Sequence, residues 1–143
     1  MSSSGATGTL IVGNTIAELQ KVVDFIENFG TAHNIPHGVT DDLNLCLDEV
    51  LNNTISYGYG DQSQHSITVT LTLTDGWLIA EIQDDGRPFD PRQAGSAPIQ
   101  GDLQSRQVGG LGLSFVEALM DEVDYERKSQ YNILKIRKKI AQA

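Results

Sequence analysis

The stretch LCLDEVLNN, residues 45–53, combines core-type and polar side chains on one predicted helix. Glu49 and Asn53 are one helical turn apart, so their side chains point the same way. A solvated face of an amphipathic helix is one interpretation of this pair, and a binding site is the other. The apolar stripe of the same helix is formed by Leu43, Leu47, Val50 and Leu51.

The composition indicates one compact, acidic domain. With 143 residues, 39% of them hydrophobic, the chain has enough apolar side chains for a single core. Its formal net charge of -9 argues against nucleic acid and membrane surfaces as partners, because both carry negative charge. No stretch has the pattern of a membrane span or a secretory leader, which predicts a cytoplasmic protein. The single cysteine, Cys46, is expected in the core.

The segment before this helix predicts a strand and a first helix. Residues 9–12 are a short apolar run typical of a strand, and residues 14–30 carry apolar side chains at helical spacing. Thr15 and Glu18 are spaced as a capping box, and Gly30 is a stop signal for this helix.

The helix that contains residues 45–53 has its own boundary signals. Thr40 or Asp41 is expected to cap its N-terminus, and the apolar spacing runs to about Tyr57. Gly58 and Gly60 follow, and they are expected to end the helix.

A β-hairpin is predicted next. Residues 65–74 and 77–84 alternate apolar and polar side chains around the turn pair Asp75-Gly76. The alternation that buries Leu78, Ala80 and Ile82 also turns Asp84 inward at the end of the second strand, whereas Asp85 points away.

An inward carboxylate needs hydrogen-bond donors. The run QDDGRPFDP, residues 83–91, also has the composition of a turn, but a turn gives Asp84 no partner on the buried side. A purine amino group, which donates a hydrogen bond from an otherwise apolar ring, would supply that partner. Gly86 would let the backbone approach the base closely.

The last third of the chain begins with a long segment that has no period, residues 88–108, which predicts a disordered loop or a functional lid. GGLGL, residues 109–113, then precedes a predicted helix. Glycines before a helix suit a phosphate-binding N-terminus, although a flexible junction has the same composition. The stripe of this helix is formed by Phe115, Val116, Leu119, Met120 and Val123, and a closing strand is predicted at residues 131–139.

This order of elements predicts an α+β sandwich, with helices on one face of a mostly antiparallel sheet. The polar clusters resemble the ATP-binding motifs of the GHKL superfamily, which includes sensor histidine kinases, type II topoisomerases and heat-shock chaperones. The N box resembles Glu49-x-x-x-Asn53, the first glycine box Asp84-x-Gly86, and the second Gly110-x-Gly112-Leu113. The small size, PFDP and GGLGL are most similar to the anti-sigma factor serine kinases of bacteria.

The resemblance implies a histidine kinase-like ATPase (Bergerat) fold, a two-layer sandwich with a mostly antiparallel mixed sheet, in one domain spanning 1–143. It implies ATP and Mg²⁺ as cofactors, with Glu49 as the general base, Asn53 as the metal ligand and Asp84 on the adenine amino group. The lid would run from about 90 to 109. Further nucleotide contacts are implied at Tyr57, Gly86, Pro88, Phe89, Gly110, Leu111, Gly112 and Leu113.

No lysine of the Walker type is present, so a lid arginine, Arg92 or Arg106, is a candidate for stabilising the transferred phosphate. The resemblance implies a kinase that phosphorylates a serine of a STAS-domain anti-sigma factor antagonist, and it implies sequestration of a sigma factor. Relatives are commonly homodimers, and the outer sheet face with Trp77 and Ile79 would provide the interface.

Two other functions remain open. One is a protein-binding module whose conformation depends on ATP but which transfers no phosphate. The other is the detached catalytic half of a histidine kinase, which would need a phosphorylatable histidine on a dimerising helix. His33, His37 and His65 all fall in or near predicted connections, where they are expected to be surface residues.

Overall fold

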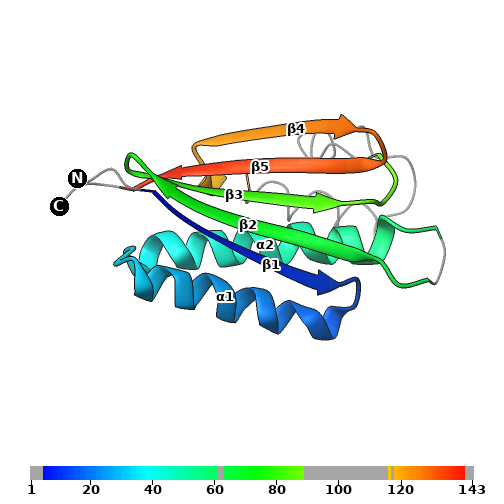
Figure 1. Ribbon diagram of the computed structural model, residues 1–143, viewed down its shortest axis with the longest axis horizontal. Helices are drawn as coiled ribbons and strands as arrows, with labels where there is room; N and C mark the ends of the chain where they lie inside the picture. The colour runs from blue at the N-terminus through cyan, green and yellow to red at the C-terminus, as the bar shows by residue number, and fades with distance from the viewer. Residues whose placement is uncertain (1–4, 61–62, 89–115, 117, 141–143) are drawn as a thin grey trace.

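One five-stranded sheet organises the described part of the chain, which comprises residues 5–60, 63–88, 116 and 118–140 of the computed structural model (Figure 1). Every strand pair within these residues is antiparallel. The strands, in the spatial order β1-β2-β3-β5-β4, are β1 (Ala6–Gly13), β2 (Ser66–Thr74), β3 (Trp77–Asp84), β5 (Tyr131–Lys139) and β4 (Glu122–Lys128).

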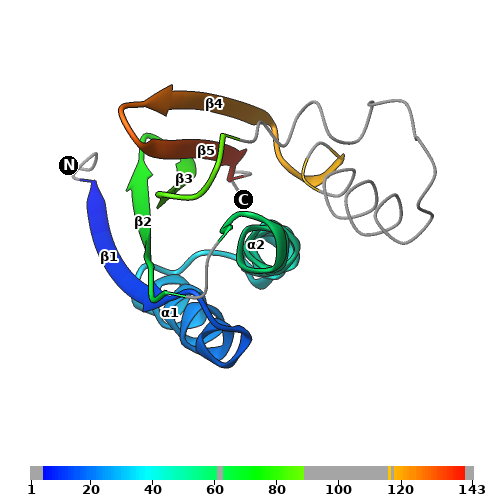
Figure 2. The same ribbon diagram turned by 90° about the vertical axis from the view of Figure 1, so that its right-hand side faces the viewer.

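Two helices cover one face of this sheet, as Figure 2 shows end-on. A short 3-10 turn, η1 (Ile16–Glu18), leads into α1 (Leu19–Ala32), and α2 (His37–Tyr57) follows. The predicted α+β sandwich is therefore confirmed, and so is the predicted apolar stripe of α2, since Leu43, Leu47, Val50 and Leu51 are all buried. No helix among the described residues is long and apolar enough to cross a lipid bilayer.

The interior between the helices and the sheet is apolar, as the alternation along the strands predicts. Leu78, Ala80 and Ile82 of β3 face the helices. Cys46 is fully buried among core side chains, and its burial raises the pKa of the thiol to about 12. This cysteine is therefore a core residue and has no thiolate at neutral pH.

The hairpin turn between β2 and β3 also agrees with its sequence signal. Asp75 and Gly76 adopt φ angles of 52° and 81°, the pair of positive values that a two-residue type I′ turn requires. The turn fixes the register, and that register places Asp84 at the inner face of the sheet.

The predicted capping box and stop of the first helix are wrong. The side chain of Thr15 makes no capping hydrogen bond, and Glu18 Oε1 instead accepts the backbone N–H of Gly13 at 3.0 Å. Glu18 thus connects the start of the helix to the end of β1. Gly30 does not end α1, which continues to Ala32.

The start of α2 was also predicted too late. The helix begins at His37 with Pro36 as its N-cap residue, so Thr40 and Asp41 lie inside its first turns. Thr40 is buried and its hydroxyl donates to the carbonyl oxygen of His37 at 3.1 Å. The C-terminus agrees with prediction, because Gly58 caps it and donates its N–H to Thr54 O.

The sequence patterns missed β4. Val123 was expected on the last helix, but it lies in β4, while Val116 and Met120 are buried as predicted. Phe115 lies outside the described residues, and so does the predicted lid at about 90–109.

Gly30 provides a test of the contact between α1 and α2. A Cβ at Gly30 would lie 2.6 Å from Cγ2 of the buried, β-branched Thr40, whereas a Cβ at Gly38 would meet nothing within 4 Å. We expect Gly30→Ala to lower the free energy of unfolding by about 1–3 kcal/mol through overpacking. Gly38→Ala should raise it by up to about 1 kcal/mol, because both positions are helical and only Gly30 is crowded. Denaturant melts of both variants would measure this, and equal effects would contradict the close packing.

Candidate functional site

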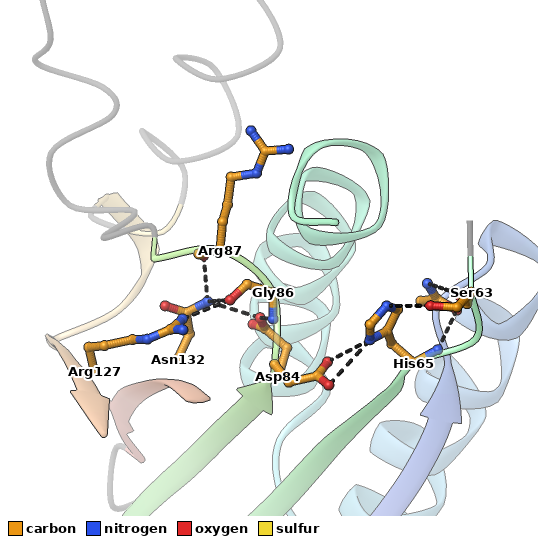
Figure 3. A network of polar contacts seen from close by, with 9 residues as sticks. Ser63, His65, Asp84, Gly86, Arg87, Arg127 and Asn132 are labelled. Atoms are coloured by element: carbon orange, nitrogen blue, oxygen red, sulfur yellow. Dashed lines mark hydrogen bonds and ion pairs between the residues drawn. The ribbon is translucent and has the colours of Figure 1, made fainter. Parts of the chain in front are cut away.

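The inward carboxylate of Asp84 forms the centre of the candidate site. It lies at the end of β3 and is only 7% exposed (Figure 3). Its Oδ1 accepts the backbone N–H of Gly86 at 2.8 Å and the side-chain amide of Asn132 at 3.0 Å. Both hydrogen bonds that Asp84 accepts from the described residues end on Oδ1. Oδ2 is therefore the atom that can accept a hydrogen bond from a ligand.

Opposing effects act on the pKa of Asp84. Burial raises the pKa of its carboxyl group, and the hydrogen bonds from Asn132 and Gly86 partly offset this effect. The negative charge of Asp85 raises the pKa further, whereas the positive charge of Arg127 lowers it. The structure thus supplies donors that favour the ionised, accepting form.

Gly86 lies where the segment after β3 packs closely against the end of α2. A Cβ at this position would lie 2.7 Å from the carbonyl oxygen of Gly58 and 3.0 Å from Asp84 Oδ1. The next residue, Arg87, donates its backbone N–H to the same Gly58 oxygen at 2.7 Å. This close approach of two backbone segments by itself explains a glycine here, whatever the ligand.

The polar face of α2 carries the predicted pair. Asn53 is 6% exposed, and its Nδ2 donates to the backbone carbonyl of Glu49 at 2.9 Å. The donor side of the amide is thereby tied to the helix, which leaves Oδ1 for a ligand. Within the described ranges the half-buried carboxylate of Glu49 makes no hydrogen bond or ion pair. Tyr57, at the end of the same helix, is 52% exposed.

This chemistry fits a magnesium ion that is held mainly by phosphate. Among the residues that the structure describes, no three histidine, cysteine, aspartate or glutamate side chains converge as a metal cage. Mg²⁺ prefers oxygen ligands and retains several waters, so one protein carbonyl oxygen beside substrate phosphates is a sufficient anchor. The remaining oxygen of Asn53 suits that role.

The sequence patterns missed two residues of the site, Asn132 and Arg127. Strand register places Asn132 of β5 opposite Asp84 of β3 and opposite Arg127 of β4. Besides Asp84, the amide of Asn132 donates to Arg87 O at 2.8 Å. A signal for Asn132 was present, because it is in phase with the buried Leu134 in β5.

The prediction that His65 is a surface residue is also wrong. Its side chain is only 17% exposed, and its Nδ1 lies 3.0 Å from an oxygen of Asp85. Its ring stacks on Tyr59 with centroids 4.3 Å apart, and its Nε2 lies 3.2 Å from the hydroxyl of Ser63. This cluster anchors the segment after α2 beside the Asp84 loop. His33 and His37 are exposed, as predicted.

Most of the predicted site residues after Arg87 lie outside the described part of the chain. Pro88 is described and exposed next to Arg87, at the edge of the site. The other predicted positions on the lid and the second glycine box lie outside the described residues: Phe89, Arg92, Arg106, Gly110, Leu111, Gly112 and Leu113.

Comparison with known proteins gives one family. A model described as the histidine kinase-like ATPase domain matches residues 12–138. The serine/threonine-protein kinase BtrW of Bordetella bronchiseptica is 30% identical over 131 residues, which cover 92% of each chain. The serine-protein kinase RsbW of Listeria monocytogenes is 28% identical over 87 residues, which cover 58% of this chain and 55% of that protein.

Solved structures agree in fold. The RsbU and RsbW domains of a Mycobacterium tuberculosis protein superimpose with a TM-score of 0.65 at 15% identity, covering 96% of this chain and 33% of that one. SiaB from the SiaB-SiaC complex of Pseudomonas aeruginosa gives 0.57 at 15% identity, covering 93% and 89%. At these identities the likeness is one of fold.

Proposed function

We propose a substrate and a mechanism from the premise that the chain belongs to the histidine kinase-like ATPase domain family, in the group of serine/threonine-protein kinases. The proposed reaction transfers the γ-phosphate of ATP, with Mg²⁺, to a serine of a STAS-type anti-sigma factor antagonist. One domain, 1–143, would do this in the cytoplasm, with a lid at about 90–109. Sequestration of a sigma factor is proposed as a second role of the same chain.

Nucleotide binding is supported by two buried side chains, each with one oxygen that accepts no hydrogen bond from the described residues. Asp84 has one oxygen held by two chain donors, and Asn53 has its amino group held by Glu49 O. Each side chain is thus held in one orientation with one oxygen left for a ligand. We assign Asp84 Oδ2 to the amino group of adenine and Asn53 Oδ1 to magnesium.

In the proposed mechanism Glu49 is the general base. The serine hydroxyl of the partner attacks the γ-phosphorus, its proton passes to the Glu49 carboxylate, and ADP leaves with the electrons of the broken P–O bond. Magnesium, when bound, neutralises charge on the phosphates. Glu49 is suited to this step because no other described group occupies its carboxylate and because Asn53 lies one turn further along α2.

The names of the two sequence relatives support a serine of a protein as the phosphate acceptor, and the STAS-type partner is proposed from the resemblance to anti-sigma factor kinases. A direct test incubates the purified protein with γ-labelled ATP, Mg²⁺ and STAS-domain proteins from the same organism, one at a time. We expect one labelled serine on the partner and no label when that serine is alanine. ATP binding without any transfer would replace this proposal with the ATP-dependent binding module.

We also propose that the chain is a homodimer that uses the outer sheet face. Trp77 and Ile79 lie on that face and are half-exposed, and neither helix covers it. Ile79→Glu should convert the dimer to a monomer in sedimentation equilibrium, since a buried charge opposes association. Leu45→Glu, at an exposed apolar position of α2, should leave the dimer intact. A wild-type monomer would refute this part of the proposal.

A further inference from the structure

The inner face of the sheet ends in a row of three polar side chains, one from each of three strands. Asp84 of β3 lies opposite Asn132 of β5, and Asn132 lies opposite Arg127 of β4. A carboxylate, an amide and a guanidinium group therefore occupy the cross-strand row that borders the site, and Figure 3 shows them converging on the loop after β3.

Arg127 contacts the loop and not the carboxylate. Its Nη1 donates to the carbonyl oxygen of Gly86 at 2.7 Å, and the Asn132 amide lies 3.5 Å from the same oxygen. A guanidinium donor to a backbone carbonyl is a charge-assisted hydrogen bond, which is stronger than a neutral one. The bond therefore fixes the peptide that follows Asp84.

Tyr125 contacts Asn132 and acts on Asp84 through it. It precedes Arg127 on the same inner face of β4, and its hydroxyl donates to Asn132 Oδ1. Since an amide that accepts on its oxygen must present its nitrogen elsewhere, this bond directs Nδ2 of Asn132 toward Asp84 and Arg87 O.

We propose that β4 is a positioning element of the nucleotide site, in which Arg127 holds the loop after β3 through Gly86 O and Tyr125 orients Asn132 against Asp84. The proposal rests on the proposed function, because the ligand is taken to be ATP. It adds two residues that act through Gly86 and Asn132. Their removal should weaken ATP binding and leave the turnover of bound ATP unchanged.

Arg127 also gives the site a particular pH dependence. Asp84 must be ionised to accept from an amino group, so affinity falls as the pH drops through its pKa. Among the described residues, the charged and titratable groups around Asp84 are Asp85, Arg127, Tyr59 and His65. Asp85 raises the pKa of Asp84 and Arg127 lowers it, and His65 lies beside Asp85. Removing the charge of Arg127 raises the pKa of Asp84, so affinity should be lost at a higher pH.

The test compares Arg127→Met with wild type by titration calorimetry of ATP and Mg²⁺ across a pH series, and by steady-state kinetics. We expect about a three- to tenfold higher Kd, an unchanged kcat, and an acidic limb of the affinity profile displaced to higher pH. Tyr125→Phe, which removes only the hydroxyl, should raise Kd about two- to fivefold and displace that limb in the same direction, because a less well oriented Asn132 lowers the pKa of Asp84 less.

Arg137→Met is the matched control. Arg137 lies on the same hairpin and pairs with Glu122 and Asp124 at 2.9 Å on the outer face. Its loss removes a positive charge and two hairpin contacts at a distance from Asp84, so ATP affinity and the pH profile should match wild type. A similar loss in this control would show that only hairpin stability matters, which would overturn the proposal.

The remaining outcomes are distinct. If wild type binds ATP and Arg127→Met binds it equally well at every pH, the positioning role is refuted while the nucleotide site stands. If Arg127→Met is unfolded by circular dichroism, Tyr125→Phe decides, and wild-type affinity in that variant refutes the role. If wild type binds no ATP, the proposed function fails and this inference fails with it.

Discussion

Glu49→Gln is expected to lower the rate of phosphotransfer by about 10²–10⁴-fold and to leave ATP affinity nearly unchanged. Glutamine has almost the same shape as glutamate but cannot accept the proton of an attacking hydroxyl. The backbone carbonyl of residue 49, which holds the Asn53 amide, is kept in this variant. Single-turnover transfer of label from ATP to the partner serine measures the rate, and calorimetry measures the affinity.

Asp48→Asn is the matched control for this change. Asp48 is the preceding residue of α2, is exposed, and points about 100° away around the helix axis. The two variants lose the same charge from the same helical turn. We expect a rate within about twofold of wild type for Asp48→Asn, since a solvent-screened carboxylate has little effect on the γ-phosphate.

The comparison separates three explanations. A large loss in Glu49→Gln alone supports proton abstraction by Glu49. Equal losses in both variants would mean that the negative charge of the helix matters and its position does not. A normal rate in Glu49→Gln would refute Glu49 as the base, and a binding function would then explain the site better.

Local periodicity explains why two parts of the site could be predicted from the sequence. The burial of Leu43 and Leu47 fixes the rotation of α2, and therefore the direction of Glu49 and Asn53. In the same way, the burial of Ile82 makes the inward direction of Asp84 a matter of counting along one strand. Neither prediction needs knowledge of a distant residue.

Counting along β5 can place Asn132 on the inner face, but it cannot show that Asn132 lies opposite Asp84 and Arg127. β4 is an edge strand in which most side chains are charged and exposed, and its alternation rests on only two apolar residues, Val123 and Tyr125. Val123 also fits the spacing of the preceding predicted helix, so this short signal did not identify a strand. Arg127 meets Asn132 only because the hairpin turn, with Ser129 at a φ of 57°, sets their register. Contacts between strands depend on pairing, which is tertiary information.

The helix starts were mispredicted for a different reason. Thr40 has the residue type of a cap, but it is buried against α1 and its hydroxyl donates to the carbonyl oxygen of His37. Packing of α1 on α2 therefore took precedence over local propensity, and the helix begins at His37. Residue preference at a helix end is a weak signal when the end itself is packed.

Asp84→Asn is expected to lower ATP affinity about ten- to a hundredfold while the protein stays folded. Oδ1 of Asp84 accepts from Gly86 N and Asn132 Nδ2, and an asparagine oxygen can keep both bonds. The new amide nitrogen must then occupy the place of Oδ2. There it would face the adenine amino group, so two donors would meet where a donor and an acceptor met before.

Because the new amide can take only this orientation, the decisive measurement compares the affinities for ATP and inosine triphosphate. Inosine triphosphate carries a carbonyl oxygen where ATP carries the amino group, so it should bind wild type weakly, because its oxygen faces the Asp84 carboxylate. In Asp84→Asn the carbonyl oxygen would meet the new amide donor, and the ratio of the two affinities should shift toward inosine triphosphate by about tenfold or more. Asp84→Ala removes the bond to ATP and also the repulsion of inosine triphosphate, so it should make the two affinities similar, whereas Asp84→Asn should make inosine triphosphate the preferred nucleotide. If Asp84→Asn weakened both nucleotides equally, the carboxylate would stabilise the loop without reading the base, and the assignment of Asp84 to the adenine amino group would be wrong.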